Sequence, residues 1–132
     1  MSLHVLDFAK IIILSEDIAE VIVNEGVAMD GQIAEELETF LILHLSAPFS
    51  VLVNKVNSYT YKFCAQLKLA NMQNLHAIAV VTYDNISKIR TEVLRDTTPA
   101  NKVWNLQLFS TRELAIEWLE VEQEKTRYDD LG

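Results

Sequence analysis

Hydroxyl and amide side chains gather directly after the apolar run at residues 49–56, and these side chains are suited to polar binding chemistry. The group consists of Asn57, Ser58, Tyr59, Thr60 and Tyr61. A second polar group, Thr82, Tyr83 and Asp84, follows the apolar run at residues 77–81. The carboxyl ends of parallel strands and the helix N-termini beside them form crevices that bind ligands and anions. The two groups therefore predict a ligand or partner surface, with Tyr59 and Tyr83 as aromatic walls.

The same residues also have a purely structural interpretation. Asn57 or Ser58 can cap a helix expected at residues 59–72, and such a cap contributes about 1 kcal/mol. Asp84 can cap the next helix, and Tyr59 can pack into the core. We expect capping by Asn57 and Ser58 first, contact with a polar ligand second, and modification of Ser58 third.

Other residues able to do chemistry form no catalytic pattern. The chain lacks nucleotide-binding glycine motifs, a zinc-protease motif, a serine-hydrolase motif and a CxxC pair. His4, His44 and His76 are far apart, and we expect structural roles for the last two. Cys64, the single cysteine, is expected to be a buried thiol within a helix. The sequence therefore predicts a protein that is not an enzyme and that needs no metal or cofactor.

Composition limits the class of protein and of partner. The chain has 132 residues and fits one domain over 1–132, with a core at about 8–120 and a polar tail at 121–132 that frays. The net charge of −8 disfavours nucleic acid and, less strongly, an anionic membrane surface. The opening residues lack the pattern of a secretory signal, and no apolar run approaches the roughly 20 residues of a membrane span. We expect a cytoplasmic protein.

Hydrophobic periodicity predicts alternating strands and helices. The expected order is β-β-α-β-α-β-α-β-α, an α/β single domain with a mixed, mostly parallel sheet, an N-terminal antiparallel hairpin and covering helices. The expected strands are Lys10–Leu14, Ala19–Val23, 49–56, 77–81 and 103–109. The expected helices start at Asp30-Gly31, at Tyr59, near Ile86 and after Ser110.

The last helix has the clearest start signal. Ser110 and Glu113 have the spacing of a capping box. Leu114, Ala115, Trp118 and Leu119 then recur at helical spacing and predict its core face. We expect Trp104 to lie in or beside the last strand and Trp118 to face the sheet.

Two expected helices carry more apolar surface than one sheet face requires. The segment FLILHL is apolar almost all round, and Ala65, Leu69 and Met72 add a second apolar face to the helix at 59–72. This surplus predicts a second burial partner: a homodimer, an apolar ligand between helix and sheet, a lipid surface, or another helix of the same domain.

From Phe8 to Leu119 the chain resembles the SpoIIAA-like branch of STAS domains. The resemblance rests on the order of elements and on three stretches, VNSYTYKFCAQLKLA, LHAIAVVTYDNISKI and NLQLFSTRELAIEWL. Anti-sigma-factor antagonists of that family carry a phosphorylated serine at the helix that follows the central strand. The resemblance implies Ser58 as the possible modification site, although the family's Asp-Ser-Ser-Gly motif is replaced here by Asn57–Tyr61.

The resemblance also implies what the protein does. It favours a non-enzymatic regulatory or protein-interaction domain that binds a partner protein or forms a homodimer. The alternative is a small-molecule or lipid carrier similar to CRAL-TRIO proteins, with transient membrane association and an apolar or phosphate-bearing ligand.

Overall fold

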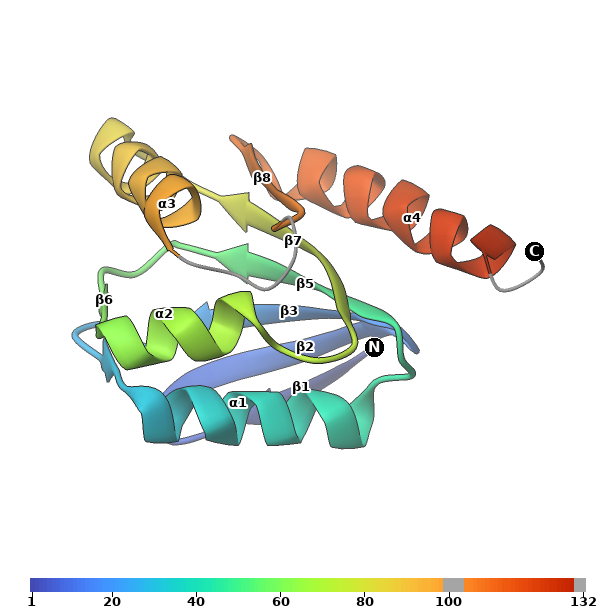
Figure 1. The fold of residues 1–132 in the computed structure, drawn as a ribbon, viewed down its shortest axis with the longest axis horizontal. Helices are drawn as coiled ribbons and strands as arrows, with labels where there is room; N and C mark the ends of the chain where they lie inside the picture. The colour runs from blue at the N-terminus through green and yellow to red at the C-terminus, as the bar shows by residue number, and fades with distance from the viewer. Residues whose placement is uncertain (99–103, 130–132) are drawn as a thin grey trace.

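The fold is a six-stranded sheet with helices on both faces, seen in a computed structural model that describes residues 1–98 and 104–129 (Figure 1). The strand order is β1-β2-β3-β5-β7-β8. The strands of this sheet are β1 Ser2–Val5, β2 Ala9–Ser15, β3 Ile18–Val23, β5 Phe49–Asn54, β7 Leu75–Val81 and β8 Leu106–Phe109. The helices are α1 Gly31–His44, α2 Phe63–Ala70, α3 Asn85–Thr97 and α4 Arg112–Asp129.

The sheet is mixed, as the sequence predicts. β1, β2 and β3 pair antiparallel, whereas β3, β5, β7 and β8 pair parallel. The predicted hairpin is confirmed as β2 and β3, whose runs of β-branched residues suit a pleated, buried surface. β1 is an additional edge strand that the sequence interpretation missed. Trp104 lies just before β8, as expected, and Val103 lies outside the described residues.

The hydroxyl cluster does not begin a helix, so the predicted helix at 59–72 is wrong at its start. Thr60 and Tyr61 form the short strand β6 (Thr60–Tyr61), which pairs with β4 (Ala28–Met29). The Thr60 N–H donates to the Val27 carbonyl, and the Lys62 N–H donates to that of Met29. α2 starts only at Phe63, and neither Asn57 nor Ser58 caps it. The chain stays extended because β4 and the residue before it supply acceptors for these N–H groups.

The predicted helix start at Asp30-Gly31 and the predicted cap at Asp84 are confirmed, and the cap predicted at Ser110 is shifted. Asp30 accepts a hydrogen bond from the Ile33 N–H at 2.8 Å, and Asp84 accepts one from the Ser87 N–H at 2.7 Å. At α4 the Leu114 N–H donates to the Thr111 hydroxyl at 3.2 Å, so the cap is one residue later than the predicted Ser110.

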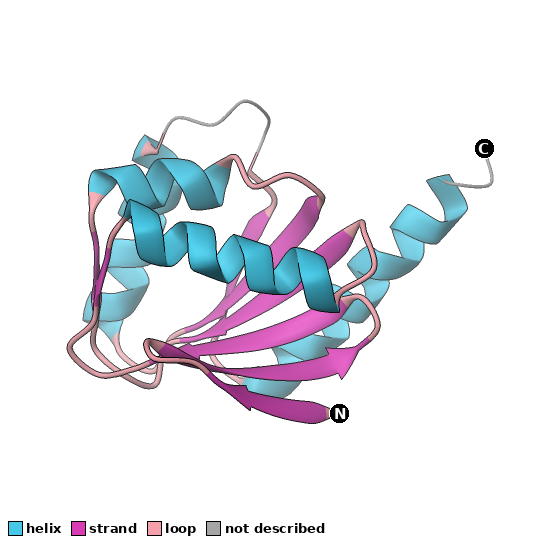
Figure 2. Ribbon diagram, turned by 90° about the horizontal axis from the view of Figure 1, so that it is seen from below, coloured by secondary structure: helices cyan, strands magenta, loops and turns pink. Residues whose placement is uncertain are grey.

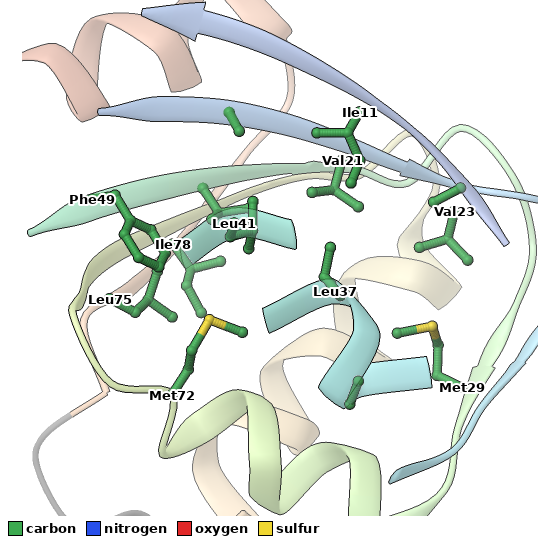
Figure 3. Packing of buried hydrophobic residues seen from close by; sticks show 14 of the residues in the cluster. Ile11, Val21, Val23, Met29, Leu37, Leu41, Phe49, Met72, Leu75 and Ile78 are labelled. Carbon is green, nitrogen blue, oxygen red and sulfur yellow. The ribbon is translucent and has the colours of Figure 1, made fainter. Parts of the chain in front are cut away.

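The sheet separates two apolar layers (Figure 2). α1 and α2 cover one face, here called the front, and α4 covers the back. Alternation along β5 sends Val51 and Val53 to the front and Leu52 to the back. In Figure 3, side chains of α1, such as Leu37 and Leu41, point toward the strand residues of the front layer.

Burial corrects several expectations about single helices. Cys64 and His44 are exposed, not buried on apolar faces. Leu114 is also exposed and takes no part in the core. Residues 121–129 of the segment expected to fray instead continue α4, and Gln123 is buried. Gln123 stays ordered because its side-chain amide donates to Asp17 and to the Pro48 carbonyl, each at 2.9 Å.

Candidate functional site

An apolar cavity lies between the front face of the sheet and helices α1, α2 and α3. Its cavity volume is about 60 Å³, and all the space between the atoms of the hollow, open solvent included, is about 750 Å³. The sheet side of the lining comprises Val21, Val23, Val51, Val53, Leu75, Ile78, Val80 and Leu106. Val21, Val23, Leu75 and Ile78 extend from the sheet toward the side on which α1 lies in Figure 3. The cavity is thus lined mainly by residues of the main hydrophobic core rather than by exposed surface residues.

Lys55 forms the polar end of this cavity. It continues the front-facing row of Val51 and Val53, one residue beyond the end of β5. Its ammonium donates to the Thr91 hydroxyl of α3 at 3.2 Å, and that hydroxyl donates in turn to the Ser87 carbonyl at 2.8 Å. Lys55 therefore joins the carboxyl end of β5 to α3 across the cavity.

Two tyrosines stand beside the Lys55 ammonium. Its nitrogen lies 5.4 Å from the centre of the Tyr59 ring and 5.6 Å from that of Tyr61, within cation–π range. The two tyrosine hydroxyls are 3.3 Å apart, so one donates to the other and the second keeps a proton free to donate. Burial raises the pKa of both phenols, and both therefore stay protonated at neutral pH.

The charge on Lys55 lacks a direct counter-ion. Burial, followed by the repulsion of Arg90, lowers the pKa of Lys55, while Asp84 opposes that shift. Within the described residues, no carboxylate forms an ion pair with Lys55. Its ammonium has three N–H donors, of which one is used by Thr91. This end of the cavity is thus suited to an acceptor, above all an anionic one.

Trp104 lies at the opposite end of the cavity. It lines the cavity just before β8, at the amino ends of the parallel strands. Its buried indole N–H finds no acceptor in the part of the chain that the structure describes. β7, with seven residues, spans roughly 20 Å between the two ends. The cavity is therefore elongated along the strands.

The residues predicted from the sequence do not form one crevice. Tyr59 and Tyr61 lie on the front side with Lys55, and Tyr61 lines the cavity. Tyr83 instead donates to the Asn54 side chain at 2.8 Å, so it is not the second aromatic wall. Thr82 is buried, and its N–H donates to the Phe109 carbonyl.

Asn57 and Ser58 form hydrogen bonds with residues 23–25 of the same chain rather than with the N-terminus of α2. Asn57 donates to the Val23 carbonyl at 3.0 Å, and the Ser58 N–H donates to the Glu25 carboxylate. Both contacts fix the loop that leads into β6. Capping therefore does not explain these residues, and their roles in ligand contact or modification remain predictions.

Lys55, Thr91 and Trp104 are site residues that the sequence interpretation missed. One signal was available for Lys55, because it follows Val51 and Val53 at the period of two that marks one face of a strand. No comparable signal identified Thr91, since its position depends on how α3 is placed over the sheet.

A second polar cluster occupies the back face at the carboxyl ends of the strands. The buried carboxylate of Glu20 accepts from Arg112 at 2.7 Å and from the Asn54 amide at 3.0 Å. Asn54 in turn accepts from Tyr83. No buried polar atom of the Glu20 and Asn54 side chains lacks a partner, and the bonds tie β3, β5 and α4 together, so we assign the cluster a structural role.

The described residues, 1–98 and 104–129, also bear on metal binding and on membrane insertion. No group of three or more His, Cys, Asp or Glu side chains is placed to hold a metal ion. No helix among them combines the length and apolar character needed to cross a membrane.

Comparison with protein-family models, with curated proteins and with solved structures found no match. The class defined by the fold is thus α/β with a mixed six-stranded sheet.

Proposed function

We propose that this protein binds a small apolar ligand in the cavity between the sheet and helices α1 to α3. The observation that carries the proposal is the cavity itself: an elongated, almost wholly apolar gap in the front core with a lysine at one end. Ligand sites are commonly apolar hollows with a few placed polar groups. The function is binding or carriage rather than catalysis.

Binding a ligand of useful size requires the cavity to widen. An apolar cavity of about 150 Å³ binds benzene, and this one encloses about 60 Å³. We expect α2 and α3 to be the helices that move: α2 has eight residues, and α3 contributes only Thr91 to the buried residues. Outward displacement of α2 and α3 breaks few apolar contacts and admits a longer chain.

The resemblance to SpoIIAA-like STAS domains supports the same proposal, because that branch is similar to CRAL-TRIO lipid carriers. We retain membership of that branch as part of the proposal. A cytoplasmic carrier or ligand-responsive regulator fits this combination of fold and cavity.

The test fills the cavity from α2. Leu69 lines the cavity, and Leu69→Trp adds bulk to it. The matched control is Leu114→Trp, because Leu114 is exposed on α4. In calorimetric titrations with decanol, we expect the wild type and Leu114→Trp to bind alike and Leu69→Trp to bind at least tenfold more weakly. Equal binding by all three folded proteins would place the ligand elsewhere.

A second candidate function is protein interaction through a homodimer. Three apolar side chains on α3 are exposed on one side of the helix: Ile86 by 64%, Ile89 by 59% and Val93 by 54%. Their spacing of three and four residues makes a continuous stripe. Light scattering of the wild type and of Ile89→Glu tests this candidate. We expect a dimer that the substitution dissociates, and a monomeric wild type would dismiss it.

A further inference from the structure

The lining of the cavity is polar at one end and apolar elsewhere. It therefore favours a ligand whose own two ends differ in polarity. Its walls are apolar along β3, β5, β7 and β8, while the Lys55 ammonium and the Tyr61 ring stand at the carboxyl ends of the strands. Two ammonium donors and one tyrosine hydroxyl proton are uncommitted there within the described chain. A ligand that satisfies these donors needs an acceptor at one end and an apolar body behind it.

We propose that the ligand is a single apolar chain ending in a carboxylate, with the carboxylate held by Lys55 and the Tyr59–Tyr61 pair. This inference rests on the proposed function, since it names the class of ligand for the same cavity. The apolar tail runs along the strands toward Trp104. Catalysis has no part in this scheme, and no bond is made or broken.

Charge balance favours a carboxylate over a phosphate. Lys55 is positive, and the two charged side chains that shift its pKa are Arg90, which is positive, and Asp84, which is negative. Their sum is one net positive charge, which a single carboxylate neutralises. A phosphate monoester carries about −1.5 to −2 at neutral pH and would leave an excess negative charge at a half-buried site.

The contacts of Lys55 explain why the free protein tolerates the unpaired charge. The faces of Tyr59 and Tyr61 and the hydroxyl of Thr91 partly replace its hydration. These groups are neutral, so they position the ammonium without neutralising it. A carboxylate can therefore still gain a charge-assisted hydrogen bond there.

The experiment compares decanoic acid with decanol, which has the same chain and no charge. Titration calorimetry at neutral pH is carried out on the wild type, Lys55→Met, Lys55→Arg and the control Lys62→Met. Lys62 is exposed and does not line the cavity. We expect the wild type, Lys55→Arg and Lys62→Met to prefer the acid. We expect Lys55→Met to bind the acid about tenfold more weakly, or by about 1.4 kcal/mol, and decanol unchanged.

The outcomes separate the two proposals. If neither compound binds the wild type, the proposed function itself fails. If decanol binds the wild type as tightly as the acid does, the proposed binding function is kept and the carboxylate proposal is overturned. This comparison uses the wild type alone, so it does not depend on the folding of any variant. Equal losses for acid and alcohol in Lys55→Met also overturn it, because a purely structural lysine would affect both compounds alike.

Discussion

The Lys55 ammonium donates to the Thr91 hydroxyl at 3.2 Å, and this contact connects the sheet to the helix that has the fewest buried residues. Both residues line the apolar cavity on the front of the sheet. If the cavity binds a ligand as proposed, we expect ligand entry to depend on the position of α3 through this one side chain.

The pH dependence of acid binding follows from the lowered pKa of Lys55. Burial and Arg90 lower that pKa in the free protein, while Asp84 opposes the shift and the neighbouring Tyr59 and Tyr61 stay neutral. As pH rises through this lowered pKa, the free protein loses the proton that the bound carboxylate requires. Affinity for decanoic acid should fall there, below the ordinary lysine pKa, and affinity for decanol should not.

The matched variant for this prediction is Lys55→Arg, because guanidinium stays charged throughout the accessible range. Titrations across alkaline pH should show the fall in the wild type and its absence in the arginine variant. An identical fall in both proteins would assign the titration to another group.

The loss of stability caused by a Leu→Ala substitution in α4 should depend strongly on which leucine is replaced. Leu119 is fully buried at 0% exposure, whereas Leu114 on the same helix is 50% exposed. Leu119→Ala should lower the free energy of unfolding by about 2–5 kcal/mol, and Leu114→Ala by less than about 0.5–1 kcal/mol. Urea denaturation measures both, and similar losses would mean that α4 is rotated from its observed position.

The capping residues predict a second contrast. Asp30→Ala removes a side-chain cap from α1 and should cost about 1 kcal/mol. The Ser58 hydroxyl makes no hydrogen bond within the described chain, so Ser58→Ala should stay within about 0.5 kcal/mol of the wild type. Ser58→Asp should be less stable than Ser58→Ala, because its carboxylate lies near that of Glu25. A stabilising Ser58→Asp in thermal unfolding would restore the capping hypothesis.

The buried carboxylate of Glu20 gives a third contrast. Arg112 is its cationic partner at 2.7 Å, so Arg112→Met leaves the carboxylate with only the Asn54 amide. We expect a loss of about 1–3 kcal/mol in unfolding free energy. Adding Glu20→Met should recover part of that loss, since the unpaired buried group is then removed. Strictly additive losses in this double-mutant cycle would show that the pair is uncoupled.

Local signals predicted the parts of the fold that local physics controls. Asp84 caps its helix and the first helix starts at Asp30-Gly31 as expected, because a short acidic side chain three residues before a free N–H group suffices. The hairpin of β2 and β3 followed from β-branched runs on both sides of a short turn. The polar residues at 121–127 misled the prediction, since burial of Gln123 depends on Asp17, over a hundred residues away.

The site was harder to predict because it depends on non-local pairing. Thr60 and Tyr61 have the composition of a helix start, yet they pair with Ala28 and Met29 from a distant segment. That pairing brings Tyr61 to the cavity and Tyr59 beside Lys55. The alternation along β5 indicated which face of the sheet Lys55 lies on. It could not indicate that a cavity lies between that face and the helices.

The most direct test of ligand binding in the cavity uses the two tryptophans of the chain. Trp104 lines the cavity, whereas Trp118 packs against Phe109 on the back of the sheet. In nitrogen–proton correlation spectra of the labelled wild type, with the indole signals assigned by Trp118→Phe, decanoic acid is added stepwise. The account predicts that the Trp104 indole signal shifts and saturates while that of Trp118 stays in place. Saturable binding that leaves Trp104 unmoved, or moves both signals equally, would contradict it.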